Sequence, residues 1–393
     1  MRSPNLHVLH VITAFDRGGA EHHLADLIRH QRDCGMQVAL AFLRGRGSSS
    51  SAVQSLGVKV QPLALRFYGD PRPLIRLRRL IKHGAFDLIH AHLPPGELYA
   101  RLALLGVDAR RVPMLITKHN DERFYDGPGR RAMCRWVARR ASAVIAISDA
   151  VHRYMAGEGI DPKKLRTIHY GMDATPFAEA RDELRTAVRR RWGVAPDELV
   201  IGFAGRFVPQ KSIDTLLRGF ALFVKQLTVR ARLALVGRGP LEASLRRLGH
   251  ELGVADKIIW AGFHDDMRGV MRAFDIFAIT SVHEGFGLVL LEAMASARPV
   301  VATRAGAIPE ILADGETGLL APSLDAQAVS AALEKMIDPA LRARFGEAGR
   351  ARVVREFTLE KMCEETDTMY ARCVRAGIAR TKEQIACAVS TVN

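Results

Sequence analysis

The sequence has 393 residues, of which 48% are hydrophobic and 25% are charged, as in globular proteins. That length exceeds what one ordinary hydrophobic core supports, so it predicts two domains. No apolar run reaches the roughly 18 residues of a membrane-spanning helix, and the formal net charge of +15 predicts an anionic partner or surface.

The five cysteines are scattered and form no Cys-x-x-Cys pair, so the sequence indicates neither a disulfide framework nor a zinc site. The segment after Met1 lacks a hydrophobic stretch of secretory length. We therefore expect a cytoplasmic protein.

Short apolar segments alternate with helical patterns along the chain. Strands are expected at 6–12, 37–43, 87–91, 114–117, 143–147, 165–168, 199–204, 232–236, 257–260, 276–279 and 299–302. This alternation predicts an α/β protein with two parallel sheets, each covered by helices on both faces. Ligands of open parallel sheets bind beyond the carboxyl ends of the strands, and two such sheets facing each other would form a cleft.

Glycine pairs follow two of the expected strands. Gly18 and Gly19 come after the first strand, where they permit a tight turn and a close approach of the backbone to a ligand. Gly237 and Gly239 occupy a similar place in the second half. Neither pair continues into Gly-x-Gly-x-x-Gly, the dinucleotide-binding fingerprint. Each pair alone is weak evidence, since a tight turn without a ligand also explains it.

Two stretches carry much of the positive charge, 66–82 and 130–140. Both resemble basic amphipathic helices that lie on anionic lipid. A solvated helix face whose apolar side packs on a sheet explains them equally well. Nucleic acid is not favoured as the partner, because no aromatic-interleaved platform accompanies the charge.

Histidines stand at the ends of two expected strands. His90 and His92 end one strand and His119 ends another, at the carboxyl edge where a ligand would lie. A neutral imidazole can hydrogen-bond a sugar hydroxyl, so we expect His119 to be catalytic and His92 to contact an acceptor. The remaining early histidines are expected to be structural: His7, His10, His22 and His23.

Two cations lie at a strand–loop–helix junction in the second half. Arg206 follows a strand and Lys211 begins the next helix, a placement that suits a diphosphate. The chain has no Asp-x-Asp, so we expect positive side chains and helix amides, rather than a divalent metal, to neutralise a departing diphosphate. No metal and no cofactor are therefore predicted.

The segment from Glu284 to Glu292 is the most informative. Its glycines, Gly285 and Gly287, let the backbone approach a ligand where an apolar helix begins at Leu288. The first amides of a helix favour an anion such as phosphate. The two glutamates more plausibly accept hydrogen bonds from sugar hydroxyls beside it. The pattern predicts a nucleotide-sugar site.

Together these motifs resemble the retaining glycosyltransferases of family 4 (group 1), which have the GT-B fold. The resemblance covers nearly the whole length and rests on Gly18-Gly19, His119, 144–148, 169–173, Gly205-Arg206 with Lys211, 235–240, Glu284 to Glu292 and 303–320. In this family the lysine is commonly followed by Gly, whereas this chain has Ser212.

The resemblance implies two Rossmann-like domains facing across a cleft. The acceptor-binding domain would span 1–172 and the donor-binding domain 173–355. Residues 356–393 would form a helix that returns to the first domain, and a tail.

The resemblance also implies roles for single residues. Arg206 and Lys211 would hold the donor diphosphate, helped by the amides of Phe286, Gly287 and Leu288. Glu284 would contact the donor sugar and be catalytic together with His119, which would face the sugar being transferred, and Glu292 would contact the ribose. Gly18 and Gly19 would lie under the diphosphate, and Gly237, Phe263 and Gly285 complete the expected donor-binding set.

We therefore expect a retaining transfer of a sugar from a nucleotide-diphosphate sugar to a hydroxyl of a lipid-linked or cell-surface glycan. Such work belongs to polysaccharide or lipopolysaccharide biosynthesis, and the enzyme would be peripheral on the inner face of the cell membrane. Two alternatives remain open: a sugar-nucleotide epimerase with the same architecture, and a non-enzymic scaffold that binds polyanions.

Overall fold

The computed structural model describes residues 6–16, 18–45, 47, 50–108, 111–120, 127–226 and 230–390, of which 377–390 are described by their backbone alone. The chain forms two compact units. Unit 1 comprises Met1–Gly171 and Leu359–Asn393, and unit 2 comprises Met172–Thr358. The boundaries expected from the sequence, 172/173 and 355/356, lie within three residues of these.

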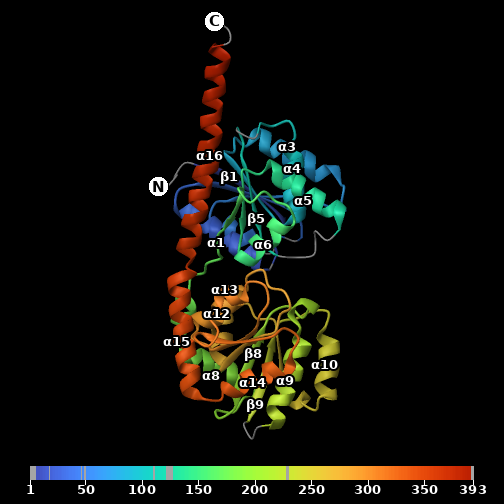
Figure 1. Cartoon of the computed structure of the whole chain (residues 1–393), viewed down its shortest axis with the longest axis vertical. Helices are drawn as coiled ribbons and strands as arrows, with labels where there is room; N and C mark the ends of the chain where they lie inside the picture. Colours follow the sequence, from blue (N-terminus) through green and yellow to red (C-terminus); the bar gives the residue numbers. More distant parts are fainter. Residues whose placement is uncertain are drawn as a thin grey trace. The chain divides into compact units, whose positions relative to one another are not determined.

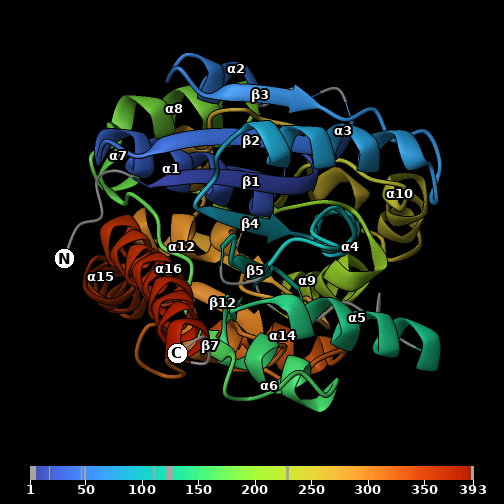
Figure 2. The same ribbon diagram turned by 90° about the horizontal axis from the view of Figure 1, so that it is seen from above.

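Unit 1 contains a seven-stranded sheet in the order β3-β2-β1-β4-β5-β6-β7, in which all pairs are parallel. Its elements are β1 (His7–Ala14), α1 (Gly19–Asp33), β2 (Gln37–Arg44), α2 (Ser50–Gln54), β3 (Lys59–Pro62), α3 (Pro71–His83), β4 (Leu88–His92), α4 (Pro94–Ala103), β5 (Met114–Lys118), α5 (Pro128–Arg140), β6 (Ala143–Ala146), α6 (Asp149–Gly157), β7 (Leu165–Thr167) and α16 (Leu359–Ser390). Helices α1 and α16 lie on one side of the sheet and α3, α4 and α5 on the other (Figure 1). Seen from above, β3, β2, β1, β4 and β5 follow one another across the sheet (Figure 2).

Unit 2 contains a six-stranded parallel sheet in the order β10-β9-β8-β11-β12-β13. Its elements are α7 (Thr175–Ala178), α8 (Asp182–Arg191), β8 (Leu199–Ala204), η2 (Pro209–Lys211), α9 (Ile213–Gln226), β9 (Ala231–Val236), α10 (Glu242–Glu251), η3 (Ala255–Lys257), β10 (Ile258–Gly262), α11 (Met267–Ala273), β11 (Ile276–Ile279), α12 (Leu288–Ala295), β12 (Val300–Thr303), α13 (Ile308–Ile311), β13 (Gly318–Ala321), α14 (Ala326–Lys335) and α15 (Pro339–Glu356).

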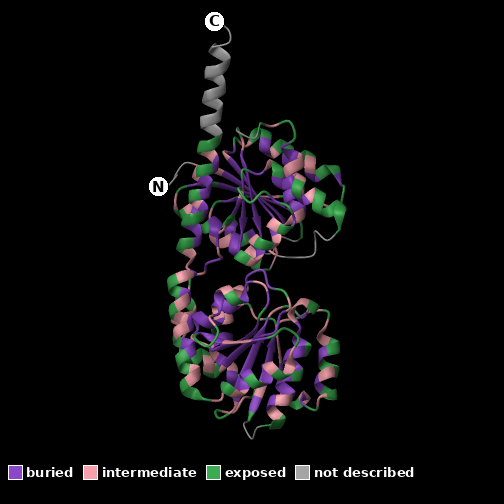
Figure 3. Cartoon of the chain, in the orientation of Figure 1, coloured by how far each residue is buried: buried purple, intermediate pink, exposed green. Residues whose placement is uncertain are grey.

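Both sheets are Rossmann-like, as the sequence predicts. The central strands are buried along their whole length, as β8 and β4 show, and Figure 3 shows this buried layer inside each unit. Because helices cover both faces, these strands read as continuous apolar runs. The edge strands β3 and β13 were not predicted. The β3 strand includes the polar Lys59 and Gln61, whereas β13 is a short apolar run of four residues, and both are partly exposed.

Side chains cap several of the helices. The Asp70 carboxylate accepts from the Arg72 amide at the start of α3, and the Ser148 hydroxyl accepts from the Val151 amide at the start of α6, at 3.1 Å in both cases. Such caps satisfy amides that have no partner inside the helix. The two caps fix the residues at which α3 and α6 begin.

The long helix α16 packs on unit 1, so the predicted return of the C-terminal helix is confirmed. The Tyr370 hydroxyl lies 2.7 Å from His90 Nδ1 and accepts from Gln31 Nε2 at 3.0 Å. His30 of α1 lies 3.1 Å from the Asp367 carboxylate. In the described part of the chain, no helix combines the length and the apolar character needed to cross a membrane.

Candidate functional site

The strand order of unit 2 places its candidate residues at one edge of the sheet. The order reverses between β8 and β11, because the chain adds β9 and β10 on one side and β11 to β13 on the other. Arg206 follows β8 and Glu284 follows β11. The loops after these two strands are tied together where the Val282 amide donates to the Gln210 carbonyl at 2.9 Å. Such a reversal is where parallel α/β sheets bind ligands.

Lys211 and Glu284 form an ion pair in this region. The Lys211 Nζ lies 2.5 Å from Glu284 Oε2, and the two side chains are only 13% and 11% exposed. The Ser281 hydroxyl donates to the same carboxylate oxygen at 3.1 Å. The pair places one positive and one negative charge at the sheet reversal, with little water around them.

Arg206 has a different environment. It is exposed, and no described residue pairs with its guanidinium. An exposed guanidinium can bind two oxygens of a phosphate in a planar fork, and the mostly buried Lys211 ammonium, five residues further along the chain, can supply a second positive charge. This is the combination that the sequence predicts for a diphosphate.

Glycines bring the ends of three strands together. A Cβ on Gly237 would overlap the Gly205 carbonyl oxygen, and a Cβ on Gly239 would overlap the Phe207 backbone. The Gly237 amide donates to the Gly262 carbonyl at 2.7 Å. Gly237 is therefore needed for backbone packing, and its contact with a donor stays a prediction.

A second glycine opens helix α12. Gly287 has φ +97° and ψ +63°, a left-handed conformation that favours glycine, and it caps the helix without a side-chain hydrogen bond. Leu288, half-buried, is the first helical residue, while Gly285 and Phe286 are buried beside it. The Phe286 ring packs against Phe357 with the ring centroids 5.8 Å apart. The positive end of α12 thus begins directly after the Glu284 loop.

Glu292 lies one turn inside α12 and is only partly exposed. Burial raises the pKa of its carboxyl from 4.5 to about 7. No described residue makes a side-chain hydrogen bond to this carboxyl. The carboxyl therefore has hydrogen-bonding capacity left for the hydroxyls of a ligand, whether it is ionised or protonated. Phe263, which follows β10, is 50% exposed.

Two supporting groups were not among the predicted site residues. The Thr303 hydroxyl donates to the Ser281 carbonyl at 2.6 Å, and the Ala307 amide donates to the Glu284 carbonyl at 2.9 Å. A Cβ on Gly306 would overlap that same carbonyl. Only the resemblance over 303–320 pointed to this segment, because its role is to fix the backbone that carries Glu284.

The candidate residues of unit 1 lie at its own sheet reversal, between β1 and β4. Gly18 and Gly19 are exposed at the start of α1, directly after β1. Gly18 has φ −172°, an extended conformation open to any residue, but a Cβ there would overlap the Glu21 carboxylate. Because the Glu21 side chain can move, this overlap does not by itself require glycine, and the role of the turn under a diphosphate stays a prediction.

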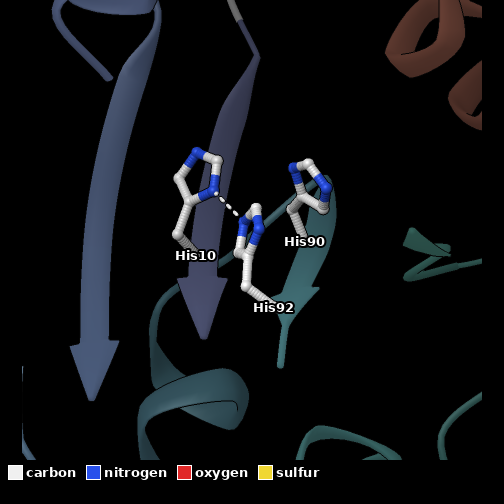
Figure 4. Close-up of side chains that lie close together, drawn as sticks. All are labelled: His10, His90 and His92. Atoms are coloured by element: carbon white, nitrogen blue, oxygen red, sulfur yellow. Dashed lines mark hydrogen bonds between the residues drawn. The ribbon is translucent and has the colours of Figure 1, made fainter. Parts of the chain in front are cut away.

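The histidines form a buried hydrogen-bonded chain. His119 Nε2 lies 3.0 Å from His92 Nδ1, His92 Nε2 lies 3.1 Å from His10 Nδ1, and His10 Nε2 lies 2.9 Å from Gln31 Oε1. The Tyr170 hydroxyl bonds to the remaining His119 nitrogen. Figure 4 shows the bond between His10 of β1 and His92 of β4, with His90 beside them.

A second branch continues from Gln31. Its amide nitrogen donates to the Tyr370 hydroxyl, which bonds to His90, and His90 Nε2 lies 2.7 Å from the Thr117 hydroxyl. Each neutral imidazole offers one donor and one acceptor. A single direction of donation, from Tyr170 through Gln31 to Thr117, therefore satisfies every ring.

Burial keeps these rings neutral. It lowers the pKa of His10 to about 4 and that of His119 to about 3. The pKa values of His23, His90 and His92 also fall well below the usual value, mainly through burial. Both ring nitrogens of His92 and of His119 are bonded to neighbours. Contacts of these rings with an acceptor or a sugar stay predictions and would require a partner to move.

Comparison with known proteins identifies the family. The model of "Glycosyl transferases group 1" matches residues 185–352, and that of "Glycosyltransferase Family 4" matches residues 17–175. The chain belongs to the group 1 glycosyltransferases of family 4. The first match covers Arg206, Lys211 and Glu284 to Glu292, and the second covers Gly18 to His119.

Curated relatives have glycosyltransferase and synthase names. The chain is 28% identical over 294 residues to the N-acetyl-alpha-D-glucosaminyl L-malate synthase of Bacillus anthracis, covering 74% of this chain and 75% of that protein. It is 29% identical over 371 residues to the D-inositol 3-phosphate glycosyltransferase of Kribbella flavida, covering 85% and 86%.

Solved structures show the same fold. The Anabaena protein HepE in complex with UDP and glucose has a TM-score of 0.84 and 22% identity, covering 93% of this chain and all of that one. The sucrose-phosphate synthase of Thermosynechococcus elongatus has a TM-score of 0.80 and 22% identity, covering 94% and 100%. The two Rossmann-like domains are those of the GT-B fold.

Proposed function

We propose that this glycosyltransferase moves a sugar from a nucleotide-diphosphate sugar to a hydroxyl of a lipid-linked or cell-surface glycan, with retention of configuration. The observation that carries the donor part is the Lys211–Glu284 pair at the sheet reversal, with Arg206 five residues before Lys211 and α12 beginning four residues after Glu284. The HepE structures that hold UDP and UDP-glucose share this fold and support the donor class.

Arg206, Lys211 and the first amides of α12 would bind the diphosphate. Each charge-assisted hydrogen bond contributes about 1.5–3 kcal/mol, and a helix terminus about 0.3–2 kcal/mol. Glu284 would bind the donor sugar once the phosphate draws Lys211 toward itself. Glu292 would accept from the ribose hydroxyls, which gives its unpartnered carboxyl its missing donors.

Retention would follow from same-face substitution. A retaining glycosidase needs a nucleophilic carboxylate about 5 Å from its acid partner, and Glu284 is instead held by Lys211 and Ser281. The departing phosphate oxygen would accept the proton of the incoming hydroxyl, while positive side chains stabilise the diphosphate without a divalent metal.

The acceptor would be presented at an anionic membrane surface. Helix α3 carries Arg72, Arg76, Arg78, Arg79 and Lys82. The loop before it exposes Phe67 and Tyr68 at 62% and 63%. Exposed aromatic rings beside a basic helix suit the lipid interface. Sedimentation with anionic vesicles should remove the protein from solution, neutral vesicles should not, and equal partitioning would contradict this part of the proposal.

The donor proposal is tested by binding. Nucleoside diphosphates and their sugars should raise the melting temperature, since a ligand of the folded state stabilises it. Arg206→Ala should lower kcat/KM by about 10- to 100-fold while leaving stability unchanged, because Arg206 is exposed. Arg230→Ala is the matched control, since Arg230 directly precedes β9 and so lies where the strands begin, whereas the candidate site lies where they end. Equal losses in both variants would contradict the assigned site.

The release of free nucleoside diphosphate separates the two enzymic alternatives. A transferase releases it only with an acceptor present, whereas an epimerase releases none. A polyanion-binding scaffold would show no turnover, and Arg206→Ala would change its affinity alone.

A further inference from the structure

Two helices of unit 1 bring three metal-binding side chains together, away from the residues assigned to sugar transfer. His30 and Cys34 lie four residues apart on α1, so they share one face of that helix. Asp367 comes from α16, which packs on α1. Their ligand atoms, one each from the imidazole, the thiol and the carboxyl, all lie within 4.8 Å of one another.

Two of the three distances between ligand atoms are close to those around one tetrahedral ion, and the third is at most 4.8 Å. His30 Nε2 lies 3.6 Å from Cys34 Sγ and 3.1 Å from Asp367 Oδ2. A zinc ion with ordinary bonds to nitrogen, sulfur and oxygen separates such ligand atoms by about 3.6 Å and about 3.3 Å. The side chains therefore need only small movements to bind a metal.

The environment also favours a ligand. The His30 and Asp367 side chains are 22% and 13% exposed, so an ion can enter from solvent. Asp367 Oδ1 is buried without a hydrogen-bond partner, which leaves the second oxygen of this carboxylate unsatisfied. Such an atom is costly unless something binds it.

The other histidine cluster, His10, His90 and His92, is also close enough to hold an ion. Its rings are fully buried and already satisfied by the hydrogen-bonded chain described above. A metal there would have to break that chain. At the α1–α16 contact a metal would instead replace the hydrogen bonds that the three ligands make with one another.

We propose that His30, Cys34 and Asp367 bind one Zn²⁺, with the fourth position open to water. Imidazole nitrogen, thiolate sulfur and carboxylate oxygen are all common ligands of Zn²⁺ in proteins. Binding would release the Cys34 proton and fasten α16 to α1. The ion would link the two helices and take no part in the sugar transfer, because its ligands are not among the residues assigned to that reaction.

Binding of Zn²⁺ and of Co²⁺ to the chelator-treated, chemically reduced full chain tests the site. Equilibrium dialysis should give about one Zn²⁺ per chain. Co²⁺ should produce the visible bands of tetrahedral coordination and a near-ultraviolet thiolate-to-metal band. Zn²⁺ should also raise the melting temperature, since it binds only the folded site.

Substitutions assign the ligands. Cys34→Ser should abolish the near-ultraviolet band, and both it and Asp367→Asn should weaken Zn²⁺ binding by at least about 100-fold. That loss exceeds the 10- to 100-fold effect of removing a mere neighbour of a ligand. Cys373→Ser on α16 and His22→Ala on α1 are matched controls that should bind as the wild type does.

Two results would overturn the proposal. One is a wild-type chain that folds without metal and shows neither the thiolate band nor stoichiometric Zn²⁺ binding. The other is Zn²⁺ binding that persists unchanged in Cys34→Ser and Asp367→Asn, which would place the ion elsewhere. The wild-type Co²⁺ spectrum decides the first result even where a variant fails to fold.

Discussion

Glu292 holds a proton near neutral pH because burial raises the pKa of its carboxyl to about 7. In the unfolded chain this carboxyl ionises near its ordinary pKa of 4.5. Stability is therefore lost as pH rises from about 4.5 to about 7, because only the unfolded state gives up its proton in that window. The loss reaches about 3 kcal/mol above pH 7.

Glu292→Gln should accordingly raise the unfolding free energy at pH 8 by up to about 3 kcal/mol, while it weakens donor binding. Chemical denaturation at pH 5 and pH 8 measures the difference, which should nearly vanish at the lower pH. Glu251→Gln, at an exposed position of α10, should show no such pH dependence. A variant that is less stable than the wild type at pH 8 would refute the expectation.

The Lys211–Glu284 pair makes each partner costly to remove alone. Removing one charge of a mostly buried pair leaves the other uncompensated, at about 3–5 kcal/mol. Lys211→Ala should therefore destabilise unit 2 more than the double variant Lys211→Ala with Glu284→Gln does.

A double-mutant cycle from denaturant unfolding gives the coupling energy of the pair. Additive effects of the two substitutions would contradict a direct interaction. Activity lost by the folded double variant then reports on donor binding rather than on stability.

At the scale of elements, glycines allow β8, β9 and β10 to end side by side. Gly237→Ala would force a Cβ against the Gly205 carbonyl at φ +132°. Overpacking and backbone strain together should lower the unfolding free energy by about 2–5 kcal/mol. Gly253→Ala is the matched control, because φ is also positive there but nothing lies within 4 Å of the added Cβ.

The control variant Gly253→Ala should lower the unfolding free energy by only about 1–2 kcal/mol, which is the cost of an alanine in a left-handed conformation. Thermal unfolding of the two variants measures the difference. Equal shifts in melting temperature would show that strain alone, without the clash, governs Gly237.

The buried histidine chain makes unit 1 sensitive to acid as a whole. Because its histidines ionise near pH 6.5 when unfolded and only near pH 4 or below when folded, the unfolded state binds more protons between these values. Stability is complete above about pH 6.5 and falls as pH decreases. Each neutral histidine contributes up to about 1.4 kcal/mol per pH unit to that fall.

Amide hydrogen exchange, corrected for the intrinsic pH dependence, should show earlier opening of β1, β4 and β5 at pH 5.5 than at pH 7.5. The strands β8 and β9 of unit 2 serve as the internal reference, since their side chains include no histidine. Equal loss of protection in both units would contradict a role for the histidine chain.

For the whole molecule, the sequence by itself determined the fold class and pointed to the candidate donor residues, whose roles stay predictions. The alternation of apolar strands with helices is a local pattern. Each strand and each helix can be predicted from its own short segment, and together these segments predict both parallel sheets. Arg206 to Lys211 and Glu284 to Glu292 are also local segments. In each segment the glycines and the charged residues lie within a few positions of one another, so the sequence alone indicates the chemistry. The strand order then places both segments at one edge of the sheet.

Only the tertiary structure decided which distant side chains meet. His10 and His23, expected to be merely structural, belong with His92 and His119 to one buried cluster. His30, Cys34 and Asp367 form a candidate zinc site although the cysteine spacing indicated none, because Asp367 lies 337 positions from His30 in sequence. Contacts across such distances follow from helix packing and burial, which no local periodicity encodes.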